Sequence, residues 1–526
     1  MSLRLLAAIA SGVVAPVALP PTSLPILPFV LAVPFALIAA SRGPRDAFRL
    51  GAATAVPFFA LHVAWLPTSF ADLLGPAFWA VFPLLVVALA AIWGTTAAFA
   101  RAIGGPGRGT LAVLAPTWIF VEWLRGLGFL GFPWGALGYG WLATPVAQWA
   151  DVVGVAGLGL LTSVTAAALA APFVGPPAAG RGLRDRFRWG VAGSGGRVAP
   201  RLRGAGPLVA VALLALAWWG GAVRLEAVRA DLRTPDRTAL LVQGDVDPLE
   251  RAAGGALDFD VHLGLTEAAV AAAVADGGAA PDLVVWPEAA VLRTPLEGFR
   301  GAPARAALEA SAPGATFVVG ARARVEGGGA NAVYTIDASG VRGRYDKHVL
   351  VPFGERWPLL DALAPVYRGI FAAFGLPMLE NTVPGPGPAA LPGDGGAVGA
   401  YVCYESVFDA IPRRMVADGA DVLINVTNDA WFARGAGARQ HFDMGRLRTI
   451  ETRRWMLRAA NDGITAVVDP TGVVRAELPR GVRDTLVVRY AERSDVTPFV
   501  RWGHLTPWLV GAAVAAAVGG ALARRV

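Results

Sequence analysis

Long apolar segments run through the first 230 residues, and they limit the possible folds more than any other feature. Seven of them approach the roughly 20 residues that a helix needs to cross a bilayer, and an eighth lies near the end of the sequence. Composition agrees, because 55% of the residues are hydrophobic and only 16% are charged, which is too apolar for an ordinary soluble enzyme. We expect membrane helices over 3–19, 22–40, 48–66, 77–100, 110–125, 146–174, 207–225 and 506–523.

Basic residues gather in alternate loops between these segments. If the helices alternate in direction, all of the basic loops lie on one side, which the distribution of arginine identifies as cytoplasmic. Both termini are then inside, and the segment 231–500 is outside. The net charge of +7 could suggest a nucleic-acid partner, but the arginines flank apolar segments and no aromatic-basic binding motif is present, so none is expected. The flanking residues are Arg4, Arg42, Arg45, Arg49, Arg101, Arg108, seven arginines between Arg181 and Arg203, Arg524 and Arg525.

Residues 231–500 alternate between short apolar strands and helical patterns. Continuous apolar strands separated by helices are typical of α/β layers whose sheets are buried on both faces. A helix is expected over 263–275. The expected strands are 238–243, 282–286, 316–320, 332–336, 340–345, 398–402, 422–426, 464–468 and 485–489.

Three polar residues come directly after expected strands of this domain. Glu288 follows DLVVWP, Lys347 follows a hairpin, and Cys403, the only cysteine, follows AVGAYV. Each has an ordinary explanation, since carboxylates and lysines are commonly solvated and a lone thiol is commonly a small buried hydrophobe. Open α/β sheets, however, place their sites at the carboxyl ends of strands. We therefore expect these three side chains to meet in one site.

The motifs around these residues resemble the nitrilase superfamily, whose three signatures are similar to WPEAA (286–290), YDKHVLVPFGE (345–355) and CYESVF (403–408). Further motifs resemble one branch of it, the apolipoprotein N-acyltransferases, so that the resemblance covers nearly the whole chain. These are VEWLRG (121–126), GFPWGALGYG (131–140), NVTNDAWF (425–432), RQHFDMGRLRTIE (439–451) and RAANDGITAVVDPTG (458–472).

The resemblance implies a multi-span α-helical membrane domain (1–230), an α-β-β-α sandwich (231–500) and a C-terminal transmembrane helix (501–526). The catalytic triad falls on Glu288 as base, Lys347 as the positive charge at the developing oxyanion and Cys403 as nucleophile. Other matched positions support the site or border the substrate. Glu355, Tyr404 and Glu405 are expected to orient the triad, and Asn428 and Trp431 to face the substrate pocket.

The substrates are likewise implied by the resemblance. A phospholipid donates its sn-1 acyl chain, and the α-amine of an N-terminal diacylglyceryl-cysteine on an apolipoprotein accepts it, at the periplasmic face of a bacterial inner membrane. No cofactor or metal is implied, and nothing in the sequence demands more than a monomer. In one place the chain departs from the family, which has an asparagine after the QG pair and a tryptophan farther on, where this chain reads VQGDVDPLERAAGG (242–255).

Two apolar loops carry open alternatives. The loop 122–141 is rich in aromatic residues and glycine, as expected for an interfacial aromatic belt or for a re-entrant loop that helps to admit a lipid chain. The segment 364–380, with Tyr367 and Phe371 at helical spacing, is expected to form a lipid-facing arm rather than a core helix, because exposed apolar patches mark contact sites.

Two other functions remain open. A membrane-tethered amidase of the nitrilase type would use the same triad to hydrolyse a C–N bond, with release of ammonia or free acid. A transport or scaffold protein would need the external domain only for binding. Transport would be favoured by a network of ionisable residues inside the membrane, but the apolar segments hold few charges.

Overall fold

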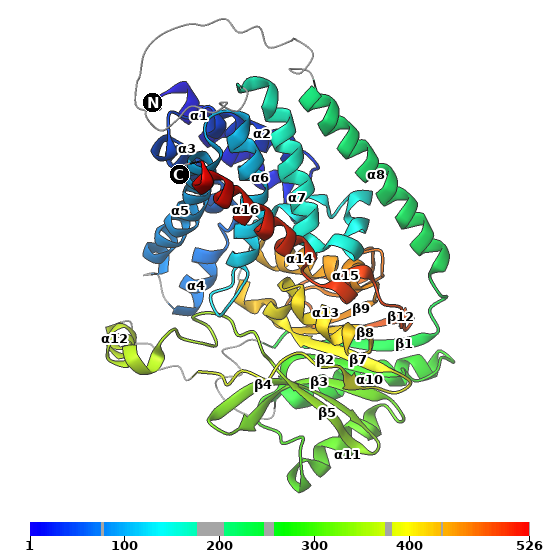
Figure 1. Ribbon diagram of the computed structural model, residues 1–526. Coiled ribbons are helices and arrows are strands. Elements are labelled where there is room, and N and C mark those ends of the chain that lie inside the picture. Colours follow the sequence, from blue (N-terminus) through cyan, green and yellow to red (C-terminus); the bar gives the residue numbers. More distant parts are fainter. Residues whose placement is uncertain (75–77, 176–204, 247–256, 374–380, 433–434, 525–526) are drawn as a thin grey trace, which may run out of the picture.

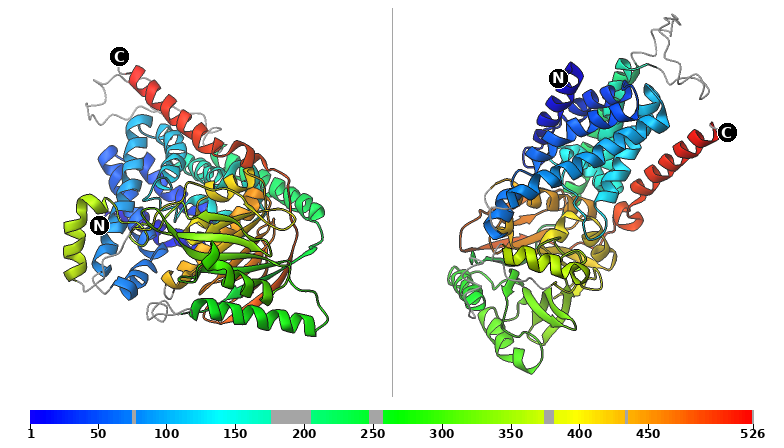
Figure 2. Two further views of the ribbon diagram at one scale, coloured as in Figure 1. Left: turned by 90° about the horizontal axis from the view of Figure 1, so that it is seen from below. Right: turned by 90° about the vertical axis from the view of Figure 1, so that its left-hand side faces the viewer.

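The structure is a computed structural model that describes residues 1–74, 78–175, 205–246, 257–373, 381–432 and 435–524. It has a helical part and an α/β part, which lie at opposite ends of the molecule (Figure 1). The C-terminal helix returns to the helical part, and both chain ends lie on its side away from the sheets (Figure 2).

Each of the eight expected apolar segments coincides with a helix of the helical part. Among the described residues, four stretches are long and apolar enough to cross a membrane by length and composition, namely Trp79–Gly104, Pro145–Phe173, Ala205–Asp231 and Leu505–Ala523. The first two helices are shorter because prolines interrupt the chain between them. The helices are α1 (Leu3–Val14), α2 (Leu27–Ala39), α3 (Pro44–His62), α4 (Leu66–Leu74), α5 (Phe78–Gly104), α6 (Arg108–Arg125), α7 (Ala150–Ala170), α8 (Ala205–Asp231) and α16 (Leu505–Ala523).

The α/β part contains two six-stranded sheets. The first has the order β12-β1-β2-β3-β4-β5 and the second the order β11-β10-β9-β8-β7-β6. The strands of the first are β1 (Arg237–Gln243), β2 (Leu283–Val291), β3 (Thr316–Val325), β4 (Gly328–Asp337), β5 (Gly340–Asp346) and β12 (Asp484–Tyr490). Those of the second are β6 (Leu391–Pro392), β7 (Ala397–Val402), β8 (Ala420–Thr427), β9 (Met456–Ala460), β10 (Thr465–Val468) and β11 (Val474–Leu478).

The two sheets pack face to face, and helices cover their outer faces. Along β1, Leu241 joins the core between the sheets, whereas Leu240 and Val242 join the core under the helices. Both faces are therefore buried, as the continuous apolar strands predicted. The helices are α10 (Leu257–Ala275) and α11 (Ala302–Ser311) on the first sheet and α13 (Ala410–Ala417) and α14 (Gly437–Thr452) on the second, where Phe442 of α14 joins the core of the sheet.

All nine expected strands are present, and the structure adds β6, β9 and β11. The sequence MLRAA of β9 carries a buried arginine, Arg458, whose charge hides the apolar pattern. β11 lies at a sheet edge and is only partly covered, so its sequence VRAEL lacks an apolar run.

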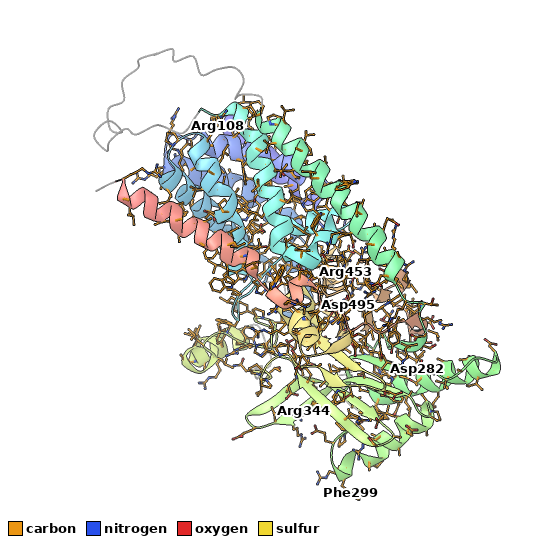
Figure 3. All side chains as sticks on the ribbon, turned by 45° about the vertical axis from the view of Figure 1, so that its right-hand side comes forward. Arg108, Asp282, Phe299, Arg344, Arg453 and Asp495 are labelled. Atoms are coloured by element: carbon orange, nitrogen blue, oxygen red, sulfur yellow. The ribbon has the colours of Figure 1, made fainter. Side chains whose placement is uncertain are left out.

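Helix α14 joins the two parts of the molecule, and nearly all of its side chains are buried. Near its start, the Trp65 indole donates to Gln440 at 2.9 Å, and Gln440 donates to the carbonyl of His62 at 2.9 Å. Just beyond its end, Arg453 donates to Asp151 of α7 at 2.8 Å. Arg453 lies at the junction of the helices and the sheets in Figure 3.

The Arg453–Asp151 contact makes a prediction about stability. Both side chains are about 95% buried, so Asp151→Ala leaves an uncompensated charge, and we expect a cost of about 3–5 kcal/mol. The Arg4–Asp46 pair, whose side chains are 36% and 30% exposed, provides the control, because a partly solvated pair contributes less and Asp46→Ala should cost no more than about 1 kcal/mol. Thermal unfolding in one detergent measures both, and equal shifts of the two melting temperatures would contradict the prediction.

Candidate active site

Cys403 lies directly after β7, at the first residue of the short 3-10 helix η7 (Cys403–Val407). Its φ is +50°, in the left-handed region that a residue with a side chain seldom occupies. The chain turns sharply from strand to helix at this residue. The sulfur is consequently placed at the carboxyl end of β7, next to the parallel strand β8.

The turn at Cys403 is held by the fully buried carboxylate of Glu405. On one side it accepts a hydrogen bond from the backbone N–H of Val402 at 2.9 Å. On the other it accepts hydrogen bonds from the Tyr345 hydroxyl at 2.6 Å and from the backbone N–H groups of His348 and Val349 at 2.9 and 3.0 Å. Glu405 thus ties the end of β7 in the second sheet to the end of β5 in the first. These hydrogen bonds give a physical reason for the prediction that Glu405 orients the residues of the site.

Glu288 projects from an irregular stretch of β2. The pairing of β2 with β3 is interrupted between Trp286 and Val291, and Ala289 has a φ of +54°. Gly320 of β3 lies so close that an added Cβ would sit 2.2 Å from the carbonyl oxygen of Pro287. A bulge of this kind re-aims a side chain next to a site, and here it places the carboxylate of Glu288.

Lys347 follows β5 and is almost completely buried between two carboxylates. Its Nζ lies 2.8 Å from Glu355 Oε2 and 3.5 Å from Glu288 Oε1. Asn331 of β4 donates to both carboxylates, at 2.7 Å to Glu288 and 3.0 Å to Glu355. Glu288 Oε2 is buried without a hydrogen-bond partner in the described structure, so one oxygen of this carboxylate is available to a substrate or to the thiol.

The charges of the site act on one another. Burial opposes the charge of Lys347, but Glu355 and then Glu288 raise the pKa of the ammonium group above its ordinary value. Burial likewise opposes ionisation of Glu355, yet Lys347 holds the pKa of Glu355 below its ordinary value. Burial, followed by the charge of Glu288, raises the pKa of the Cys403 thiol, and Lys347 acts in the opposite direction. The resting side chain of Cys403 is therefore a thiol, which would need a base before it could act as a nucleophile.

The residue after the nucleophile contacts the helical part directly. The Tyr404 hydroxyl donates to the carbonyl of Gly131 at 2.6 Å, and its ring stacks on Trp134 at 5.8 Å. Gly131 and Trp134 belong to the loop that was expected to be an aromatic belt or a re-entrant loop. In the structure this loop packs against the catalytic elbow.

The other expected substrate residues make contacts of their own. Asn428 is buried and accepts from the N–H of Ala430, whereas Trp431, on η8 (Asp429–Phe432), is 52% exposed. Tyr367 lies on α12 (Leu360–Ala373), and its hydroxyl donates to the carbonyl of Pro358 at 3.0 Å. Phe371 belongs to the same helix, but its side chain is outside the described structure, as are residues 247–256 of the departing segment. Substrate binding by these residues remains a prediction.

Four further buried residues surround the site, and sequence reasoning assigned none of them a role. They are Asn331, Asp429, His441 and Arg458. Asn331 could have been suspected, because it is a polar residue at the start of the apolar run of β4. The other three lie inside the motifs that carry the family resemblance, but their spacing along the chain gives no sign that they meet.

Cys403, Asp429 and His441 each bring a possible metal ligand within 4.8 Å of the others. Arg458, however, already forms an ion pair with Asp429 at 2.7 Å, and the positive charge of Lys347 acts on Cys403. A cation at this point would face two positive charges. The cluster fits a hydrogen-bonded support of the nucleophile better than a metal centre.

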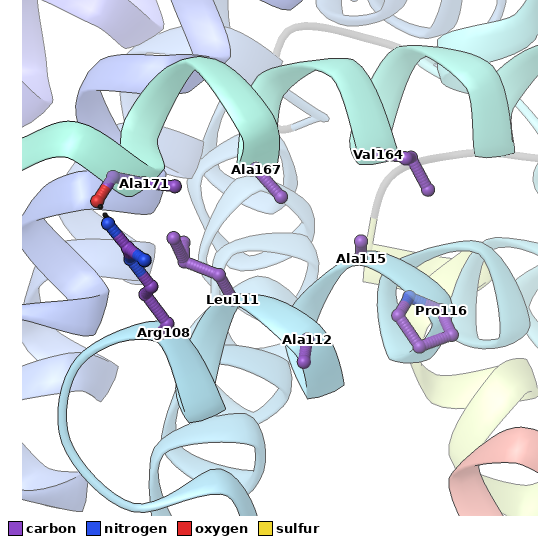
Figure 4. Close-up of a pocket in the computed structure, with 8 residues that line it drawn as sticks. All are labelled: Arg108, Leu111, Ala112, Ala115, Pro116, Val164, Ala167 and Ala171. Carbon is purple, nitrogen blue, oxygen red and sulfur yellow. Dashed lines mark hydrogen bonds between the residues drawn. The ribbon is translucent and has the colours of Figure 1, made fainter. Parts of the chain in front are cut away.

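A cavity of about 220 Å³ lies away from this site, between α6 and α7. Arg108 closes one end of it and donates to the carbonyl of Ala171 at 3.4 Å (Figure 4). Figure 3 places Arg108 at the end of the helical part opposite the sheets, so this cavity is not the catalytic pocket. Its lining is Arg108, Leu111, Ala112, Ala115, Pro116, Val164, Ala167 and Ala171.

Two protein-family models match the chain. The carbon-nitrogen hydrolase family matches residues 241–496, and the apolipoprotein N-acyltransferase N-terminal domain matches residues 11–168. Fold and site thus define a nitrilase-like carbon-nitrogen hydrolase domain joined to a set of apolar helices.

Comparison with individual proteins shows which branch of this class the chain resembles. The apolipoprotein N-acyltransferase of Sinorhizobium medicae is 37% identical over 435 residues, which cover 78% of this chain and 74% of that protein. That of Rhizobium leguminosarum bv. trifolii is 32% identical over 94% of this chain and 92% of its own. A solved amidase from Nesterenkonia sp. aligns with 50% of this chain and 93% of its own at 21% identity and a TM-score of 0.35. The chain belongs to the apolipoprotein N-acyltransferase family, and it is an enzyme of lipoprotein N-acylation rather than an amidase.

The charge of Glu288 leads to a prediction with two parts: Glu288→Gln should make the Cys403 thiol more reactive towards an alkylating agent, but it should lower the rate of acyl transfer. Removing the negative charge lowers the pKa of the Cys403 thiol, so iodoacetamide should alkylate Cys403 faster at pH 8 than in the wild type. Acyl transfer should fall about 10²- to 10⁴-fold, because glutamine cannot accept a proton. The control is Glu326→Gln, which alters an exposed turn and should change neither rate. Slower alkylation in Glu288→Gln would contradict the prediction.

Proposed function

We propose that this enzyme transfers an acyl chain from a membrane phospholipid, through a thioester on Cys403, to the α-amine of an N-terminal S-diacylglyceryl-cysteine of an apolipoprotein. The observation that carries the proposal is the convergence of Glu288 and Lys347 from the first sheet with Cys403 from the second, in a buried site covered by a loop of the helical part. An acyl transfer between two substrates is eased by a covalent intermediate, and a thiolate is a suitable nucleophile.

In the first half-reaction, the sulfur of Cys403 attacks the sn-1 ester carbonyl of the phospholipid while Glu288 takes the thiol proton. Lys347 stabilises the oxyanion that develops on the carbonyl oxygen. The C–O bond to glycerol then breaks, Glu288 returns the proton to the departing alkoxide, and a lysophospholipid leaves. The acyl group remains on Cys403 as a thioester.

In the second half-reaction, the α-amine of the lipoprotein cysteine attacks the thioester carbonyl. Glu288 accepts a proton from the amine, and Lys347 again faces the oxyanion. The C–S bond breaks, the sulfur recovers a proton from Glu288, and the product is an amide. One carboxylate therefore serves both halves, which agrees with the free buried oxygen of Glu288.

Both substrates are held in the bilayer by acyl chains, and withdrawing them costs about 0.8 kcal/mol per CH₂. A site attached to membrane helices avoids most of that cost. The exposed apolar side chains of Leu363 and Val366 on α12, and of Leu359 just before it, support a lipid-facing arm. In this proposal Tyr367 and Phe371 of α12 contact acyl chains, while Asn428 and Trp431 border the pocket. The enzyme acts as a monomer in this proposal.

One prediction of this proposal concerns the acyl intermediate on Cys403. Wild-type protein incubated in detergent with phospholipid labelled in the sn-1 chain, without acceptor, should carry a hydroxylamine-sensitive acyl group on Cys403, and a diacylated lipopeptide should discharge it. Cys403→Ala should be inactive and Cys403→Ser nearly so, because an alcohol is far less readily ionised than a thiol. Mass spectrometry of the Cys403 peptide measures the adduct, and substantial turnover by Cys403→Ala would refute the proposed nucleophile.

The second prediction concerns topology. We propose that residues 1–230 form a membrane domain with seven transmembrane helices, that residues 231–500 are periplasmic, that residues 501–526 contain the last transmembrane helix, and that both termini are in the cytoplasm of a cell with an inner membrane. In a Cys403→Ala background, a cysteine at Phe299, which is 94% exposed, should react with an impermeant maleimide in intact spheroplasts. A cysteine at Arg524 should react only after lysis, and the reverse pattern would overturn the orientation.

A further inference from the structure

Cys403 occupies a backbone conformation that its neighbours have to enforce. A residue with a Cβ seldom adopts a φ of +50°, and such conformations persist only where the surrounding structure over-determines them. Glu405 restrains the N-terminal side of the turn through the N–H of Val402. The carbonyl of Cys403 is a second point at which the turn can be restrained, in addition to the hydrogen bonds within η7.

His441 of α14 supplies the contact at that carbonyl. Its Nε2 lies 3.0 Å from the carbonyl oxygen of Cys403 and 2.9 Å from the Ser406 hydroxyl. A carbonyl oxygen can only accept, so this contact is a hydrogen bond when Nε2 carries a proton, and Ser406 Oγ is then a second acceptor of the same N–H. All three residues are buried, and water therefore cannot easily replace this donor.

A chain of buried polar groups fixes the plane of the His441 ring. Its Nδ1 lies 2.9 Å from Asp429 Oδ1. The other oxygen of Asp429 accepts from Arg458 at 2.7 Å, and Oδ1 also accepts from Thr427 at 3.0 Å. Burial opposes ionisation of Asp429, but Arg458 and His441 hold the pKa of this carboxyl below its usual range. The arrangement orients the ring in the way that a carboxylate orients a histidine in other sites.

The same geometry argues against two other roles for His441. As the general base it would have to accept the thiol proton, but its Nε2 proton is directed at the backbone carbonyl of Cys403. As a metal ligand it would share the cation with Cys403 and Asp429, in the positive field of Arg458 and Lys347. What remains is a mechanical role in holding the nucleophile.

We propose that His441 is a positioning residue, whose Nε2–H donates to the carbonyl of Cys403 and holds the nucleophile elbow in the conformation that presents the sulfur to the acyl donor. The proposal rests on the assignment of Cys403 as nucleophile. It also gives the buried helix α14 a part in catalysis, because α14 carries His441 and is bonded at both ends to the helical part through Gln440 and Arg453.

Three substitutions at this position separate the donor from the bulk of the side chain. In His441→Gln, the amide N–H reaches about as far as Nε2 and can still donate to Cys403. In His441→Asn, the shorter side chain reaches only about as far as Nδ1, so the contact is lost. His441→Ala removes all polar contacts. The measured quantity is the single-turnover rate of Cys403 acylation by phospholipid, together with the phospholipid KM, the melting temperature and the pH profile.

We expect the acylation rate of His441→Gln to stay within about threefold of the wild-type rate. The rate of His441→Asn should fall about 10- to 100-fold, because a displacement of about 1 Å at a reacting group can cause a loss of that size. The KM and the midpoint of the pH profile should stay constant, because neither substrate binding nor the titrating base is altered. Equal rates for His441→Gln and His441→Asn, or a shifted midpoint, would overturn the positioning role.

A measurement on the wild-type protein covers the case in which the variants fail to fold. ¹⁵N-histidine NMR of the enzyme in lipid, with the His441 ring signal assigned through its correlations to the backbone, should show a protonated Nε2 at neutral pH. An unprotonated Nε2 would overturn the proposal. Cys403→Ala, assayed in parallel, separates the two assignments. Turnover by Cys403→Ala would refute the assignment of Cys403 as nucleophile. An inactive Cys403→Ala together with a fully active His441→Asn would refute only the positioning role of His441.

Discussion

The catalytic site depends on one buried carboxylate that joins the two sheets. Glu288 and Lys347 come from the first sheet and Cys403 from the second, so the proposed triad can form only while the ends of β5 and β7 are held together. Glu405 holds them with four hydrogen bonds, three from the β5 side and one from Val402. Burial raises the pKa of this carboxyl, while the hydrogen bonds from Tyr345 and the backbone oppose that rise. Charge-assisted hydrogen bonds of this kind are among the stronger ones in proteins, and here they fix distances that the sheets alone would leave loose.

The helical part contributes more than attachment to the membrane. Its loop around Gly131 accepts a hydrogen bond from the residue next to the nucleophile, and α7 accepts the buried charge of Arg453 through Asp151. The Glu451 carboxylate accepts from the N–H of Val155, which is released from the helix pattern by the kink at Gly154. The active site is therefore built from three layers, two sheets and a helical cover, rather than from a sandwich with an anchor.

Much of this arrangement was predictable from the sequence. The apolar segments located the helices, the continuous apolar strands located most of both sheets, and the three polar residues that follow strands do come together in one buried site. The remainder depends on contacts between distant segments. β9 was missed because Arg458 interrupts its apolar run, and that arginine is tolerated only because Asp429 neutralises it. The support around His441 was missed because residues from η8, α14 and β9 meet only after folding, and no local spacing records that meeting.

Helix α14 belongs to the α/β part by its position in the sequence and to both parts by its packing. It contributes His441 to the elbow of Cys403, Gln440 to the end of α3, and the neighbouring Arg453 to α7. Relatives of this enzyme therefore cannot exchange their halves freely at the boundary near residue 231. A working chimera of this enzyme would have to take α3, α7 and α14 from the same parent, because a buried helix and not the chain boundary joins the two parts.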